Sequence, residues 1–250
     1  LHTGIHSFPT RRSSDLVAFD GRFIPALAAT NTDGTDPRAA ERARAATARL
    51  VAEWPALRAR LVVAGAGAPP AARWPAMLAE TDRLVAEAGA RVRAGRYADA
   101  HDTLEHARAG MLDARRTAGL AYLVDRLVEF HEPMEALAAR APAARAGRLD
   151  DAGRAEMVRT FAHARALWLA VERAAVDPAR LGLSPQRLEQ YRRGVADESA
   201  ALTRLSEALR AGDAASIGAA AESVKSPFAR AYTAFGQPPD EAPAPSSPTR

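Results

Sequence analysis

Apolar residues recur every three or four positions over most of this chain, and this helical period constrains the fold more than any other feature. One apolar stripe runs from Tyr97 to Ala114, and a second runs from Leu188 to Leu209. This spacing places the apolar residues on one face of an α-helix. Alanine, the strongest helix former, makes up roughly a quarter of the 250 residues. Strand-like alternation never persists for more than a few residues, so we predict an all-α fold.

Proline, glycine and capping residues divide the chain into predicted helices joined by short loops. Asp36 before Pro37 and Ser184 before Pro185 are typical helix starts, whereas Gly119 follows two arginines at a predicted helix end. Long amphipathic helices with short connections favour an up-and-down helical bundle, here with four main antiparallel helices plus flanking helices. The predicted helices cover 37–63, 71–94, 97–118, 120–141, 150–175, 185–210 and 214–235, with bends at Pro55 and Pro227 and loops at 64–70 and 141–150.

The same pattern predicts one structural domain with irregular ends. Residues 37–236 are expected to form this helical bundle domain. Residues 17–36 are short and apolar and end in TNTDGTD, so we expect an extended leader there. Residues 237–250 are rich in proline and are expected to form a disordered tail.

Composition excludes several classes of function. The chain has no cysteine, which excludes disulfides, thiolate metal sites and covalent haem attachment. We find no run of about 18 apolar residues that could span a membrane. The net charge of +4 is spread along helical faces rather than gathered in a basic stripe, so nucleic-acid binding is not expected. Phosphate-binding loops and common catalytic motifs are also missing, which favours a non-enzymatic protein.

Two histidine–glutamate pairs with the same spacing are the main candidate site. His101 and Glu105 are four residues apart, as are His131 and Glu135, so each pair shares one helix face. If the two helices form a hairpin turning near residue 118, all four side chains lie at one height. His163 and Glu198, from the next two predicted helices, fall at a similar height. Glu198 also lies on an apolar stripe, where a carboxylate is costly unless it is paired.

This layer could hold a transition metal ion, since histidine and carboxylate ligands suit zinc, copper, iron or nickel and bundle cores carry such sites. The predicted function is therefore a non-enzymatic binding protein with a His/Glu metal site. The first alternative is a structural or protein-interaction bundle with no ligand, in which the pairs are ordinary polar contacts and the partner is a protein or a second copy. The second is a haem electron carrier using Met134 and a histidine, although Met134 also fits core packing. His106 lies on another helix face and is expected to be solvated.

The first sixteen residues have a separate origin. Residues 6–16, HSFPTRRSSDL, match the first-frame translation of a common sequencing-library adapter. The resemblance implies that residues 1–16 are a non-native segment, which should be left out of fold reasoning. We therefore expect the natural start, and any signal peptide, to be missing, and we expect deletion of this segment to leave stability unchanged.

Five segments between residues 18 and 236 carry a second resemblance: FIPALAATN, AHDTLEHAR, FHEPMEAL, YRRGVADESAAL and VKSPFARAYTAFG. They are similar to a group of uncharacterised, exported bacterial helical-bundle proteins. The resemblance implies an all-helical domain and a periplasmic or secreted location. It implies no activity and no assigned ligand, but two of the segments contain the His/Glu pairs.

Overall fold

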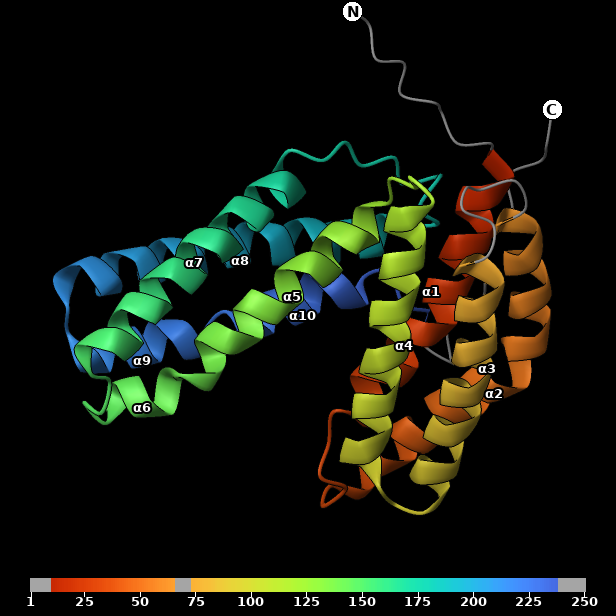
Figure 1. The fold of residues 1–250 in the computed structure, drawn as a ribbon, viewed down its shortest axis with the longest axis horizontal. Helices are drawn as coiled ribbons and strands as arrows, with labels where there is room; N and C mark the ends of the chain where they lie inside the picture. Colours follow the sequence, from red (N-terminus) through yellow and green to blue (C-terminus); the bar gives the residue numbers. More distant parts are fainter. Residues whose placement is uncertain (1–9, 66–72, 238–250) are drawn as a thin grey trace, which may run out of the picture. The chain divides into compact units, whose positions relative to one another are not determined.

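The computed structural model describes residues 10–65 and 73–237, and this part of the chain is all-α, as predicted (Figure 1). None of the described helices is both long and apolar enough to cross a membrane. The described residues form ten helices: α1 Thr10–Thr30, α2 Pro37–Gly65, α3 Arg73–Arg93, α4 Tyr97–Thr117, α5 Leu123–Ala139, α6 Ala141–Arg145, α7 Asp151–Glu172, α8 Pro185–Ala211, α9 Ala214–Glu222 and α10 Lys225–Thr233.

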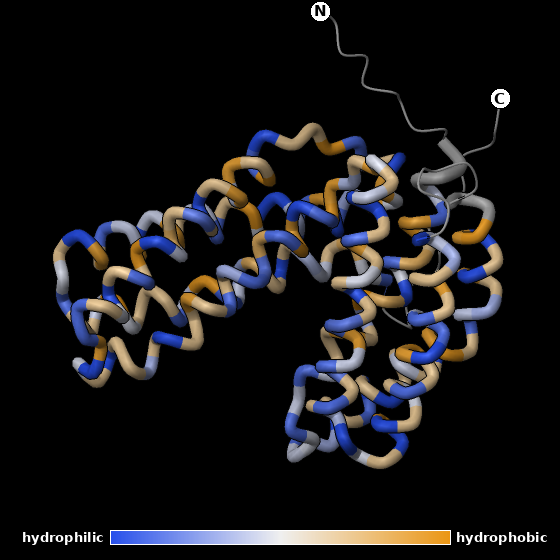
Figure 2. The backbone as a smooth tube through the Cα atoms, viewed as in Figure 1, coloured by the Kyte–Doolittle hydropathy of each residue, from blue (hydrophilic) through white to orange (hydrophobic). Residues whose placement is uncertain are grey.

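The chain divides into two compact units, where the sequence pattern predicted one helical bundle domain over 37–236. The first unit contains α1 to α4, the segment 177–184 and the described residues 235–237. The second unit contains α5 to α10. Each unit buries its own apolar side chains, and the amphipathic pattern of the helices is visible along the backbone in Figure 2.

The first unit is an up-and-down four-helix bundle. Helix α1 packs on α2, α2 on α3, α3 on α4, and α4 returns to α1. The short turn between α3 and α4 depends on Gly95, whose φ of +74° lies in the left-handed region that glycine adopts without strain. Leucines and large aromatic residues fill the core, among them Phe19, Phe23, Leu50 and Leu104.

Helix α1 corrects the prediction of an extended leader at 17–36, because the chain is helical as far as Thr30. Gly21 and Pro25 weaken the local helix signal. Burial overrides it: Phe19 and Phe23 stack with their ring centroids 4.9 Å apart, and both are 1% exposed. Of the proposed adapter segment, residues 1–9 lie outside the described residues. Leu16 is only 2% exposed, in the core of the first unit.

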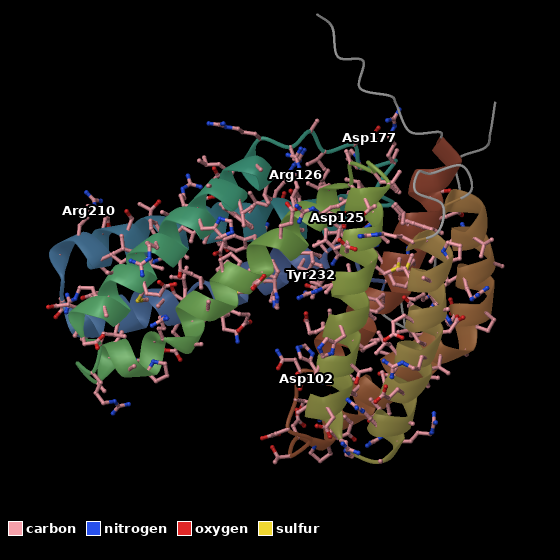
Figure 3. The ribbon with its side chains drawn as sticks, viewed as in Figure 1. Asp102, Asp125, Arg126, Asp177, Arg210 and Tyr232 are labelled. Carbon is pink, nitrogen blue, oxygen red and sulfur yellow. The ribbon has the colours of Figure 1, made fainter. Side chains whose placement is uncertain are left out.

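The second unit is also a helical bundle. Helix α5 packs on α7, α7 on α8, α8 on α10 and α10 on α5, while the short helices α6 and α9 pack on each other. Aromatic residues hold the middle of this unit together. The Phe130 ring lies 4.6 Å from that of Trp168 and 5.8 Å from that of Phe228. Phe228 also stacks on Tyr232 of α10, which Figure 3 labels.

Two local predictions in the second unit are wrong. Residues 141–145, expected as a loop, form the single-turn helix α6. The expected helix over 214–235 is two helices, with a break at Ser223 and Val224. Pro227 therefore lies in the first turn of α10 rather than at a bend, where its missing N–H costs no helical hydrogen bond. The predicted tail lies almost wholly outside the described residues.

Candidate functional site

The two helices that were expected to form a hairpin and align the two His/Glu pairs belong to different compact units. Helix α4 pairs with α3 and α1 in the first unit, and α5 pairs with α7 and α10 in the second. Gly119, with φ of +67°, ends a helix as predicted, but the chain passes there from one unit toward the next. His101 and Glu105 thus belong to the first unit. The other four predicted ligands, His131, Glu135, His163 and Glu198, belong to the second.

In the first unit, His101 and Glu105 connect α4 to its neighbours. The His101 Nδ1 atom lies 3.0 Å from the Leu27 carbonyl oxygen of α1, so the ring donates from Nδ1. Its Nε2 atom lies 3.7 Å from Glu105 Oε1. The other oxygen of Glu105 accepts a hydrogen bond from Arg108, which is 7% exposed. The carboxylate is thus already neutralised by a buried guanidinium, which disfavours its use as a metal ligand.

In the second unit, His131 and Glu135 make a similar contact between α5 and α10. The His131 Nε2 atom lies 3.7 Å from Glu135 Oε1, and its ring centroid lies 5.4 Å from that of Phe228. Glu135 Oε2 is 2.8 Å from the Nζ atom of Lys225, the only lysine of the chain. Both His/Glu pairs are therefore joined to a cation and help to fix one helix against another.

The remaining two predicted ligands have different surroundings. His163 is exposed on α7 and lines a groove of about 450 Å³ between α5 and α7, together with Glu129, Glu132 and Glu156. Glu156 is paired with Arg159. Glu198 is 0% exposed inside the second unit. Its predicted position on the apolar stripe of α8 is confirmed.

Both carboxyl oxygens of Glu198 lack a hydrogen-bond partner of ordinary geometry. Burial raises the pKa of Glu198 to about 8, because a charge is poorly solvated there. The backbone N–H of Phe228 and the positive charge of Arg204 lower the pKa, but by less than burial raises it. Glu198 is therefore mostly protonated at neutral pH and is a poor ligand for a cation under those conditions.

Among the described residues, no group of three or more histidine, aspartate or glutamate side chains is arranged to hold a metal ion. Within each unit, the His/Glu pair stands without a third histidine or carboxylate in a metal-binding arrangement among the described residues. Met134 is 1% exposed, which fits core packing. His106 is exposed, as predicted.

A different feature of the first unit is a groove of about 310 Å³ between α3 and α4. Its floor is formed by buried residues, mainly Met77, Leu84, Ala107 and Ala114. The small exposed residues Ala76 and Gly110 leave it open to the surface. The groove spans Arg73 to Leu84 on α3, which corresponds to about 16 Å of helix.

Gly110 is unlike the other glycines that lie inside the described helices. A methyl group at Gly21, Gly89, Gly153, Gly194 or Gly218 would lie 2.5–3.1 Å from a neighbouring atom, so those positions are small because another group packs closely. A methyl group at Gly110 would meet nothing within 4 Å. Glycine inside a helix costs about 1 kcal/mol relative to alanine. None of the described residues packs closely enough to account for that cost at Gly110.

Charged residues line the rim of the groove. Arg73 of α3 and Asp113 of α4 form an ion pair of 3.1 Å across one end. Glu80 lies on the α3 edge and is paired with Arg83, and His106 lies on the α4 edge. An apolar floor with a charged rim can bind the apolar face of a helix. The sequence pattern did not predict this site. The one indication in the sequence was Gly110, a glycine within the helix predicted over 97–118.

Comparison with known proteins adds no assignment: no protein-family model, curated protein or solved structure matches the chain.

Proposed function

We propose that this chain is a non-enzymatic protein-interaction bundle and that the α3/α4 groove of its first unit docks the apolar face of a partner helix. This is the protein-interaction alternative of the sequence analysis. The observation that carries it is Gly110, an exposed glycine in the middle of α4 with open space where a side chain would be. Elsewhere in this chain, an interior glycine marks a close contact with another group.

The shape of the groove supports a helix as the occupant. Its length of about three turns matches the contact that a short amphipathic helix makes through residues i, i+3 or i+4, and i+7. Met77 and Leu84 supply apolar contact, and the missing side chain at Gly110 gives room for a bulky apolar residue of the partner. The His/Glu metal site receives less support, because Arg108 and Lys225 already bind the glutamates of the two pairs.

A displayed library of amphipathic helical peptides tests this proposal. Helices that bind the purified protein should carry bulky apolar residues at helical spacing, and Gly110→Leu should abolish their binding by filling the groove. The variant should fold, because a Cβ atom at this position meets no neighbour. Circular dichroism checks that it does.

Ala86→Leu is the matched control, since Ala86 is an exposed small residue of α3 that does not line the groove. This variant should bind the selected helices as the unmodified protein does. If no helix is selected, or if the selected helices bind Gly110→Leu equally well, the proposed docking site is wrong.

A further inference from the structure

The two helices that line the α3/α4 groove run antiparallel, and two contacts fix their register. Arg73 of α3 donates to the Thr117 hydroxyl of α4 over 3.4 Å, and Arg91 of α3 donates to the Asp99 carbonyl oxygen over 2.7 Å. Counting along both helices from these contacts places Gly110 level with Glu80, near the middle of the groove. A bulky side chain seated over Gly110 is therefore central in the groove.

The groove has one closed end and one open end. At the closed end, the Arg73–Asp113 ion pair crosses from α3 to α4. The open end is lined by Leu84 and His106, and there no ion pair between described residues joins the two helices. A helix centred over Gly110 can therefore extend past His106 but not past Arg73 and Asp113.

His106 is the one polar side chain of the rim that has no partner among the described residues. Each rim carboxylate already holds an arginine: Glu80 accepts hydrogen bonds from Arg83, and Asp113 is paired with Arg73. His106, by contrast, forms no hydrogen bond or ion pair with any described residue. Its ring N–H is available to a docked partner, and an imidazole N–H donates to a carboxylate whether the ring is neutral or protonated.

We infer that the partner helix carries an acidic residue that binds His106, one turn away from the bulky apolar residue, here called the anchor, that fills the space over Gly110. This inference rests on the proposed function, because it adds the chemistry of the partner to the same groove. Gly110 and His106 are four residues apart, which is about 6 Å along α4. In a helix that lies along the groove, a residue three or four positions from the anchor is displaced by about 4.5–6 Å and so lies beside His106.

Asp102 limits where that acidic residue can lie. It is exposed on α4 one turn beyond His106, where Figure 3 labels it, and it does not line the groove. It also has no hydrogen-bond or ion-pair partner among the described residues. Like charges placed opposite each other oppose binding. An acidic residue is therefore expected three or four positions from the anchor and is disfavoured seven or eight positions from it, where Asp102 favours lysine or arginine.

Sequencing the helices selected from the displayed library tests this inference, with every position around the anchor randomised. Helices that bind the unmodified protein should be enriched in aspartate or glutamate three or four positions from a bulky apolar residue. His106→Glu should reverse this preference toward lysine or arginine. Helices with the acidic residue should bind His106→Glu at least about tenfold more weakly than the unmodified protein, because two carboxylates then lie opposite each other.

His163→Glu is the matched control, because His163 is an exposed histidine of α7 in the second unit and the substitution is the same. This variant should bind the selected helices as the unmodified protein does. Circular dichroism checks that both variants fold. Replacing the acidic residue of a selected helix by glutamine should weaken its binding to the unmodified protein but not its binding to His106→Ala, since both changes remove the same contact.

This inference and the proposed function fail in different ways. Selected helices that Gly110→Leu no longer binds, but that lack the acidic residue or bind His106→Glu unchanged, retain the docking groove and overturn the inference. Enrichment of lysine or arginine beside His106 in helices selected on the unmodified protein also overturns it. If no helix is selected, the docking groove and the inference are both wrong.

Discussion

Replacing Glu198 by glutamine should remove most of the pH dependence of stability in the second unit. Glu198 is 0% exposed, neither of its oxygens has a hydrogen-bond partner of ordinary geometry, and burial raises its pKa from 4.5 to about 8. The folded state therefore holds a proton that the unfolded chain releases at much lower pH. Glutamine has nearly the same shape and no charge at any pH, so it reproduces the protonated form.

The sign and size of the effect follow from these two pKa values. Below pH 4.5 the Glu198 carboxyl group is protonated in both the folded and the unfolded state. It then contributes no pH dependence to the free energy of unfolding. Between the two values the folded state binds one more proton than the unfolded state, so the free energy of unfolding falls as pH rises, by about 1.4 kcal/mol per pH unit. Above the pKa of the folded state, the decrease in the free energy of unfolding is complete and amounts to about 3–5 kcal/mol. Glu198→Gln should thus change stability little at pH 5 and increase it by that amount above pH 8.

Urea unfolding at several pH values, followed by pulsed hydrogen exchange and mass spectrometry, measures this effect for peptides of α8 and α10 separately from the first unit. Glu207→Gln is the matched control, because Glu207 is an exposed residue of the same helix and should leave the pH profile unchanged. The reasoning is refuted if Glu198→Gln and the unmodified protein lose stability equally between pH 5 and pH 8.

Four other outcomes are expected. Leu16→Ala should destabilise the first unit by about 2–5 kcal/mol in urea unfolding, because Leu16 is 2% exposed; no change would support an adapter-derived segment that does not pack. Gly110→Ala should raise stability by about 1 kcal/mol in the same assay, and a loss would show that the position is already filled. Gly194→Ala should cost about 1–3 kcal/mol, since its Cβ would lie 2.5 Å from the Ala231 nitrogen; an unchanged melting temperature would contradict this packing. Calorimetric titration of metal-free protein with zinc should give no heat of binding. A zinc-induced rise in melting temperature that His131→Ala loses and His106→Ala keeps would restore the metal hypothesis.

Local signals in the sequence were sufficient to predict most of the helices. The ends of α3, α4 and α8 lie within a few residues of the predicted ends, and Asp150 and Asp213 cap α7 and α9 through their side chains. These signals act over one or two turns, so they need no knowledge of the rest of the fold. The position of Glu198 on the buried face of α8 was predictable for the same reason, because the 3.6-residue period alone assigns a residue to a face.

Helix α1 is a local prediction that failed because packing outweighs propensity. The segment was predicted to be extended because it is short, apolar and ends in TNTDGTD, yet it is helical, and Phe19, Phe23 and Ile24 are each at most 1% exposed. Burial of one such side chain contributes about 1.5–3 kcal/mol, so the three together outweigh the cost of about 1 kcal/mol for Gly21 and about 3 kcal/mol for Pro25 in a helix.

The pairing of helices was decided by the tertiary structure alone. An apolar stripe shows that a helix face is buried, but not which other stripe it contacts, and Gly119 ends α4 equally well before a hairpin or before a new unit. The two His/Glu pairs share a spacing but belong to different units, and within its unit each contacts a neighbouring helix, α1 for His101 and α10 for His131. Gly110 shows the reverse dependence: its residue type was visible in the sequence, but the open groove beside it arises only when α3 packs against α4.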